Sequence, residues 1–181
     1  MRAFIAIDLP AELKDKIASF QAELKKADVF KGKFVEKENL HLALKFIGEI
    51  SDKDMAKISK SLEGLSKKHK GFVLSLKGIG AFPSKDYIRV IWIGVDKGGS
   101  EAKALHDDIN KALKSKESRE FVGHLTLARV KAVLDKKKLT EFLDENKEFG
   151  SFAVKSIKLM KSELTKQGPK YETIKVFALA D

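Results

Sequence analysis

Apolar residues recur along this chain with two different spacings, and each spacing predicts one kind of element. Residues 3–9 are almost all apolar, which is typical of a buried strand. After Pro10, apolar residues recur every three or four positions, which predicts a helix with one buried face. The residues of that face are Leu13, Ile17, Phe20 and Leu24. The lysine-rich stretch that follows, with Phe30, Gly32 and Phe34, is expected to be a loop.

Two short stretches alternate leucine with polar or small residues, which is the pattern of a strand with one buried face. The first covers residues 40–46 and contains His41, and the second covers residues 123–130 and contains His124. In each stretch the leucines occupy the buried face, so we expect the histidine to project from the opposite face. Thr126 shares the face of His124.

The same series of elements occurs twice along the chain. Each half reads strand, helix, histidine strand, helix, strand; the last strand of the second half is expected at residues 152–159, and one more strand follows at residues 171–179. Ser51 with Asp54 resembles a capping box at the start of one helix, and Asp135 is expected to cap another. This order predicts a single domain with an internal duplication, whose copies cover approximately residues 1–84 and 85–181. Two such copies most simply face each other across a cleft near a pseudo-twofold axis, with one histidine from each copy.

Composition narrows the class of protein. The chain has 181 residues, enough to bury a core, and no apolar run approaches the roughly 18 residues of a membrane span. Asp8 and Pro10 interrupt the apolar N-terminus before the core of a signal peptide could form. The absence of cysteine excludes disulfides, thiolate nucleophiles and cysteine-bound metals. We expect a cytoplasmic monomer that does not enter membranes.

The formal net charge of +10 has two explanations. A positive surface attracts polyanions, of which nucleic acid is the commonest in a cell. However, most of the basic residues are lysines interleaved with glutamates, and growth at high temperature selects such surfaces as well. The charge is therefore compatible with a nucleic-acid substrate and does not establish one.

Two histidines facing each other can act as a general acid and a general base on one phosphodiester. The unperturbed pKa of histidine is about 6.5, so a protonated and a neutral ring coexist near neutral pH. One ring takes a proton from the attacking oxygen while the other gives a proton to the leaving oxygen. A strained cyclic phosphate suits such a pair, because water opens it without a protein nucleophile. The hydroxyl of Thr126 could donate to a phosphoryl oxygen. The pattern does not say which histidine has which role.

The two histidine motifs resemble the paired His-x-Thr-x motifs of the two-histidine (2H) phosphoesterases. Within that superfamily the chain is most similar to the RNA 2′,3′-cyclic phosphodiesterases, also called 2′-5′ RNA ligases. The resemblance covers nearly the whole chain. Its other segments are residues 2–7, 39–41, 46–48, 81–83, 89–92, 127–129 and 162–171.

The resemblance implies an α+β fold of two lobes, with two mainly antiparallel sheets facing a central cleft and helices on the outer faces. It implies opening of a 2′,3′-cyclic phosphate at an RNA end, tRNA fragments included, to a 2′-phosphomonoester without metal or cofactor. On that analogy His41 gives a proton to the departing 3′ oxygen and His124 activates water. A 5′-hydroxyl in place of water would form a 2′-5′ linkage, so ligation is the same chemistry with another nucleophile.

The first motif departs from the family pattern, because Ala43 stands where threonine is usual. One side-chain donor to phosphate is therefore missing, and a backbone N–H or Lys45, on the same nominal face, could replace it. Arg129 is a further candidate phosphate ligand, because a guanidinium fits phosphate bidentately. Strict alternation places Arg129 on the face opposite His124, so it reaches the cleft only at the strand end or through a bulge.

Other candidates have more than one interpretation. Phe34 and Tyr171, beside lysines near the expected cleft mouth, either stack on bases or pack within the protein, and the same holds for Phe30. His69 and His106 are expected at the surface.

Three alternative functions remain at this stage. A metal site formed by the two histidines is disfavoured, because no spacing in the chain matches a known ligand motif. A non-catalytic RNA-binding module would use the same cleft as a clamp, for which arginine or lysine would be the expected residues. A related phosphoesterase would act on small cyclic nucleotides.

Overall fold

The computed structural model describes residues 1–115, 120–166 and 168–181, and it contains both helices and strands along the whole chain. The helices are α1 (Ala11–Ala27), α2 (Asp52–Ser66), α3 (Gly99–Ala112), α4 (Lys136–Asp144) and the short 3₁₀ helix η1 (Lys37–Asn39). The strands are β1 (Arg2–Asp8), β2 (Phe30–Phe34), β3 (His41–Glu49), β4 (Phe72–Pro83), β5 (Ile88–Val95), β6 (His124–Val133), β7 (Glu148–Val154), β8 (Ser156–Thr165) and β9 (Gly168–Ala178).

The strands form two antiparallel groups that meet in the middle of one continuous path. Their order is β7-β4-β5-β6-β3-β1-β8-β9, and β2 pairs with the outer part of β6. Within the described residues β3 and β6 share one residue pair, Leu42 with Leu125, whereas the other neighbours pair along most of their length. The expected α+β fold is therefore confirmed, and in the part of the chain that the structure describes the two expected antiparallel sheets are joined through this one pair into a single nine-stranded sheet.

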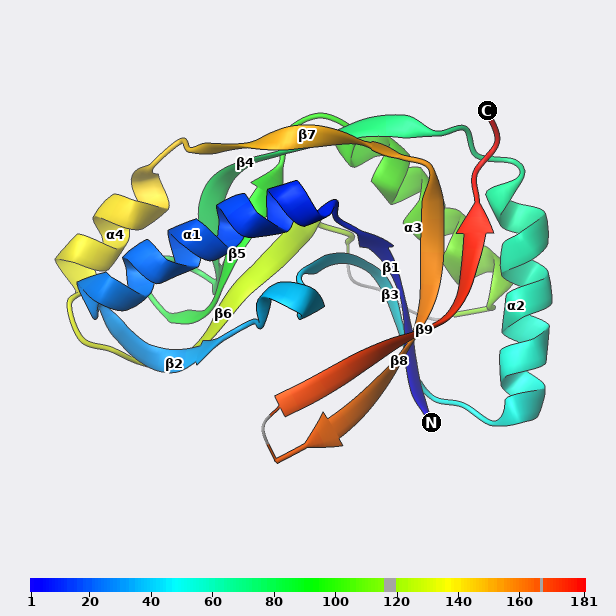
Figure 1. Ribbon diagram of the computed structural model, residues 1–181, viewed down its shortest axis with the longest axis horizontal. Coiled ribbons are helices and arrows are strands. Elements are labelled where there is room, and N and C mark those ends of the chain that lie inside the picture. The colour runs from blue at the N-terminus through cyan, green and yellow to red at the C-terminus, as the bar shows by residue number, and fades with distance from the viewer. Residues whose placement is uncertain (116–119, 167) are drawn as a thin grey trace.

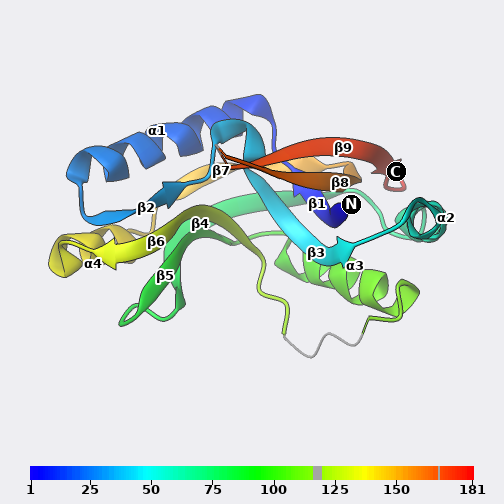
Figure 2. The same cartoon turned by 90° about the horizontal axis from the view of Figure 1, so that it is seen from below.

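The helices cover the two ends of the molecule (Figure 1). Helices α1 and α4 pack on the sheet that contains β4, β5, β6 and β7, and α2 and α3 pack on the sheet that contains β1, β3, β8 and β9. Figure 2 shows the same division from below. Each lobe thus takes elements from both halves of the sequence, because α1 and β4 join the lobe of β6, while α3 and β8 join the lobe of β3.

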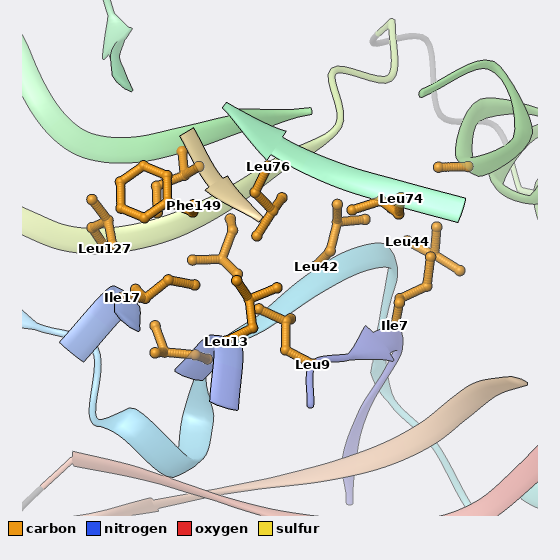
Figure 3. Packing of buried hydrophobic residues seen from close by; sticks show 14 of the residues in the cluster. Ile7, Leu9, Leu13, Ile17, Leu42, Leu44, Leu74, Leu76, Leu127 and Phe149 are labelled. Atoms are coloured by element: carbon orange, nitrogen blue, oxygen red, sulfur yellow. The ribbon is translucent and has the colours of Figure 1, made fainter. Parts of the chain in front are cut away.

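Side chains from both lobes meet in one hydrophobic core (Figure 3). Leucines of the two histidine strands contribute to it, and Leu42, Leu125 and Leu127 are fully buried. Burial of such a side chain stabilises the fold by about 1.5–3 kcal/mol. The buried leucine faces therefore fix the histidine strands, as the alternating pattern predicts.

The structure confirms several predicted elements. The helix after Pro10 buries its predicted face. Ser51 and Asp54 form a capping box, in which the Ser51 hydroxyl accepts from the backbone N–H of Asp54 at 3.2 Å. Asp135 caps α4 by accepting from the backbone N–H of Lys138 at 3.0 Å.

Two expectations about the elements were wrong. The lysine-rich stretch before the first histidine strand is not a loop but strand β2, which pairs with β6. Gly32 permits this pairing, because a Cβ atom there would overlap the carbonyl oxygen of Arg129. The single strand expected at residues 152–159 is two strands, β7 and β8, which belong to different lobes and are separated at Lys155.

No helix within the described ranges is long and apolar enough to cross a membrane. The cytoplasmic location stays a prediction from the sequence.

Candidate active site

The two histidines begin the two strands that meet between the lobes. His41 is the first residue of β3 and His124 is the first residue of β6. The residues that follow them, Leu42 and Leu125, pair with each other in antiparallel register. Antiparallel geometry therefore places both histidines on the face opposite the buried leucines, as diagonal neighbours ordinarily about 7–8 Å apart. This single pair brings together two residues that are distant in the sequence.

Each imidazole ring is oriented by a backbone carbonyl two residues earlier. The Nδ1 atom of His41 lies 2.7 Å from the carbonyl oxygen of Asn39, and the Nδ1 atom of His124 lies 2.7 Å from that of Val122. A carbonyl oxygen only accepts, so Nδ1 carries the hydrogen in both rings. Nε2 is then the nitrogen that can exchange a proton with a ligand, and both rings have the same orientation relative to their strands.

Aromatic side chains hold each ring from its own lobe. His41 lies against Phe4 of β1 and Tyr171 of β9, with ring centroids 5.0 and 5.3 Å apart. His124 lies against Phe82 of β4, at 4.9 Å and an interplanar angle of 90°. These packed neighbours restrict the rotamers of both rings, which favours a preorganised site.

Both histidines line one cleft of about 640 Å³, a size that is ordinary for a small-molecule site. Thr126 and Arg129 line it as well, together with the two stacking candidates Phe34 and Tyr171. The structure therefore brings all six predicted site residues to the same cavity. Their roles stay predictions.

Burial lowers the pKa of His41 below its usual value, because removing an imidazolium from water disfavours its charged form. The carbonyl of Asn39 and the carboxylate of Asp8 oppose this shift. Positive charge on Lys14 and on His124 adds to it. Asp8 lies opposite His41 on β1 and forms an ion pair of 2.8 Å with Lys14. In the free protein the neutral form of His41 is therefore favoured.

A bulge in β6 places Arg129 on the cleft face. Thr126 pairs with Trp92 of β5, but the next pair joins Ala128 to Ile91, so Leu127 is skipped. This extra residue shifts the alternation, and Arg129 returns to the face of His124 and Thr126. Arg129 is exposed and forms no ion pair within residues 1–115, 120–166 and 168–181, so its guanidinium is available to an anion.

Strand β3 contains the corresponding bulge. Ala43 pairs with Ala6 of β1 and Lys45 pairs with Ile5, so Leu44 is skipped. The residue that returns to the cleft face is Phe46, five positions after His41 just as Arg129 is five positions after His124. Phe46 lines the cleft and is 69% exposed. Sequence reasoning missed it, because the bulge leaves no signal in the hydrophobic pattern.

Simple alternation would place Lys45 on the same face of β3 as His41 and Ala43, but the bulge at Leu44 changes its position. The bulge ends the alternation before it, and the side chain is only 8% exposed in the wall of the cleft. Its ammonium group donates to the hydroxyl of Ser115 at 2.8 Å. Any role as the replacement for the missing threonine at Ala43 stays a prediction.

The surface positions expected for the other two histidines were wrong. His106 is 5% exposed, lies 2.7 Å through Nδ1 from the carbonyl oxygen of Leu44, and stacks on Phe121 at 4.6 Å. The buried face of α3 extends to position 106, next to Leu105. His69 is half-buried, and its Nε2 lies 3.0 Å from a carboxylate oxygen of Asp108. His106 lines the wall of the cleft, but within the described residues neither its ring nor that of His69 packs on His41 or His124.

No group of three or more histidine, aspartate or glutamate side chains in the described part of the chain is arranged to hold a metal ion. The predicted site residues in the cleft instead include the two imidazoles of His41 and His124, the hydroxyl of Thr126 and the guanidinium of Arg129. This set can exchange protons and bind an anion.

Comparison with known proteins identifies the family. The family model described as "LigT like Phosphoesterase" matches residues 7–92 and again residues 93–171. The chain belongs to the LigT-like phosphoesterase family. The sequence-based resemblance to the 2H phosphoesterases and the expectation of an enzyme are thereby confirmed.

Members of the family from several organisms match this phosphoesterase over nearly their whole length. A protein of Methanocaldococcus jannaschii named RNA 2′,3′-cyclic phosphodiesterase is 42% identical over 180 residues, which are 97% of this chain and 99% of that protein. A protein of Methanothermobacter thermautotrophicus with the same name is 37% identical over 188 residues, 99% of both chains. The crystal structure of Escherichia coli LigT complexed with 3′-AMP has a TM-score of 0.78 and 28% identity, and covers 99% of this chain and 98% of that one.

Proposed function

We propose that this phosphoesterase hydrolyses 2′,3′-cyclic phosphodiester ends of RNA to 2′-phosphomonoesters, without a metal, through His41 and His124. The observation that carries the proposal is the matched pair of imidazoles, each with Nδ1 held by a backbone carbonyl at 2.7 Å, in one cleft. The names of the two relatives and the 3′-AMP in the LigT complex support an RNA end as the substrate.

In the proposed reaction a water oxygen bonds to phosphorus while Nε2 of His124 takes the proton of that water. The bond between phosphorus and the 3′ oxygen breaks, and Nε2 of His41 gives its proton to the departing oxygen. The product carries a 2′-phosphomonoester and a 3′-hydroxyl. The protonation states of the two rings are then exchanged, and solvent restores them. The assignment of donor and acceptor rests on the family resemblance.

The electrostatics of His41 set a condition on this mechanism. Burial lowers the pKa of His41, whereas a general acid must be protonated. A phosphodiester bound next to the ring carries a negative charge, which favours the imidazolium. Substrate binding therefore raises the pKa of His41 and prepares the acid at the step that needs it.

Thr126 and Arg129 bind the phosphoryl oxygens in this proposal. Extending the register of the single pair Leu42 and Leu125 by one residue sets position 126 across from position 41, so the Thr126 hydroxyl is proposed to bind the phosphoryl group beside His41. The guanidinium of Arg129 supplies positive charge on the same face. Ala43, across from His124, supplies no hydroxyl, so phosphate is held mainly from the side of β6.

Aromatic residues of the cleft are proposed to hold the base. Phe34 and Tyr171 were the candidates from sequence, but the ring of Tyr171 packs on Phe4 and His41, and Phe34 packs on Phe30 at 5.2 Å. Phe46 offers the most accessible ring. Stacking of a base on an accessible aromatic ring contributes about 1–3 kcal/mol.

The test is incubation with a synthetic RNA that ends in a 2′,3′-cyclic phosphate, in the presence of a chelator. The expected product is a 2′-phosphomonoester, and His41→Ala and His124→Ala should each slow its formation by about 10²- to 10⁴-fold. Full turnover in either variant would contradict the acid–base pair, and loss of turnover with the chelator would contradict metal independence.

The same test distinguishes two further functions, 2′-5′ ligation and non-catalytic RNA binding. A 2′-5′ ligation would need only a 5′-hydroxyl in place of water, and the same incubation with a second RNA detects it. A non-catalytic RNA clamp would leave the cyclic phosphate intact. The monomeric state and tRNA fragments as substrates stay predictions.

A further inference from the structure

A second groove adjoins the cleft on the side of β2. It lies between the C-terminal half of α1 and β2, which Figure 2 shows side by side, and its volume is about 690 Å³. Lys33, Phe34, Val35 and Glu36 line both cavities. The end of β2 is therefore a shared wall, and a ligand that leaves the cleft over this wall enters the groove.

The groove is rich in lysine. The charged residues of its walls are Lys25, Lys31, Lys33, Lys37, Asp28 and Glu36. Lys37 forms an ion pair with Asp15. Lys25 and Lys31 are exposed and form no ion pair with any part of the chain that the structure describes. Two ammonium groups without a carboxylate partner thus face the groove, which makes it complementary to an anionic chain.

The groove is held in a fixed position relative to the catalytic strand. The buried side-chain amide of Gln21 on α1 donates to the carbonyl oxygens of Val35 and Leu127, at 2.9 and 3.0 Å. Val35 follows β2, and Leu127 is the bulge residue of β6 between Thr126 and Arg129. One side chain therefore ties α1, the end of β2 and the strand of His124 together.

We propose that this lysine groove binds the nucleotides on the 5′ side of the cyclic phosphate, so that the preferred substrate is a single-stranded RNA oligonucleotide and not a free cyclic nucleotide. The proposal rests on the function proposed above. A cyclic nucleotide alone has one phosphate, and in the proposed function this phosphate lies between the two histidines. An oligonucleotide continues from its 5′ oxygen with one negative charge for each added nucleotide, and the groove supplies the complementary charge next to the cleft.

The test compares a 2′,3′-cyclic mononucleotide with oligonucleotides lengthened one nucleotide at a time at the 5′ end. The groove variant is Lys25→Glu/Lys31→Glu. The matched control is Lys57→Glu/Lys60→Glu, on the exposed side of α2 at the other end of the molecule. Each double variant changes the net charge from +10 to +6, since 10 − 4 = 6. General attraction of RNA therefore falls equally in both.

The expected result is a kcat/KM that rises with length in the wild type. Each phosphate contact on a single strand contributes about 0.7 to the slope of log affinity against log salt concentration. In 0.1 M salt one contact therefore raises the affinity about fivefold relative to 1 M salt. Loss of two contacts should therefore lower kcat/KM for the longer oligonucleotides about 25-fold in the groove variant, relative to the control. Turnover of the cyclic mononucleotide should be the same in both variants.

Other outcomes would overturn the inference. A kcat/KM that does not depend on length, or an equal loss in the groove and control variants, would show that the groove takes no RNA, while hydrolysis of the oligonucleotides would leave the proposed function intact. If wild-type protein hydrolyses neither substrate, the proposed function fails, and the groove is judged by fluorescence anisotropy with a 3′-phosphorylated oligonucleotide and the same variants. Binding of an acidic peptide, but not of RNA, in a manner sensitive to Lys25→Glu/Lys31→Glu would assign the groove to a protein partner.

Discussion

Leu42 is the residue through which the strand of His41 pairs with the strand of His124. Its truncation should therefore lower both the stability of the protein and its catalytic rate. The side chain is 0% exposed. A Leu→Ala change at such a site lowers the free energy of unfolding by about 2.7–5.0 kcal/mol. In a chain of this size each kcal/mol corresponds to a shift of about 2–4 °C in Tm. Leu42→Ala should therefore lower Tm by about 5–20 °C.

The control is Leu62→Ala. Leu62 is also 0% exposed, but it lies on α2, away from the cleft. Both variants should lose similar stability in a thermal melt. In contrast, kcat/KM for a 2′,3′-cyclic phosphate should fall about 100-fold in Leu42→Ala alone, because a displacement of about 1 Å between catalytic groups has an effect of that order. The rates are measured well below both Tm values.

Equal activity in Leu42→Ala and Leu62→Ala, at matched stability, would refute the claim that this residue pair positions the rings. Leu42→Met provides a second check. It preserves volume and should lower the free energy of unfolding by less than about 1.5 kcal/mol, so most of the activity should return.

Burial lowers the pKa of His41 in the free protein, whereas a bound phosphodiester raises it. Since kcat/KM reports the free enzyme and kcat reports the complex with substrate, kcat/KM should decline at a lower alkaline pH than kcat. Declines of kcat/KM and kcat at the same pH would contradict this. Arg129→Gln should lower kcat/KM about 10- to 100-fold, and Arg129→Lys should recover only part of it, whereas unchanged kinetics in Arg129→Gln would exclude contact with phosphate. Ala43→Thr should raise kcat about 2- to 10-fold by restoring one hydroxyl donor, and no change would show that the missing donor does not matter.

Local patterns in the sequence were sufficient for the elements with strong periodicity. Helix α1 and the two histidine strands follow directly from the spacing of their apolar residues. The capping box of Ser51 and Asp54 is a local signal as well. Duplication then predicted that His41 and His124 share one cleft, because equivalent positions in two copies meet near the axis that relates them.

Features that depend on contacts between distant residues could not be predicted. Strand β2 is short and has only two large apolar residues, and its pairing depends on the approach of Gly32 to the backbone of β6. The bulges at Leu44 and Leu127 depend on pairing with β1 and β5. They decide that Phe46 and Arg129 face the cleft. His106 was misplaced because its burial requires the carbonyl of Leu44, which lies far away in the sequence.

Stereochemistry at phosphorus tests the central claim most directly, namely that water attacks on one side of the phosphorus atom while the 3′ oxygen leaves on the other. The measurement is hydrolysis of a P-chiral 2′,3′-cyclic phosphorothioate in ¹⁸O-labelled water, with the configuration of the product determined. A single in-line displacement between His124 and His41 predicts inversion. Retention would indicate two successive displacements through a covalent intermediate, or adjacent attack with pseudorotation, and either would contradict a single displacement between the two histidines.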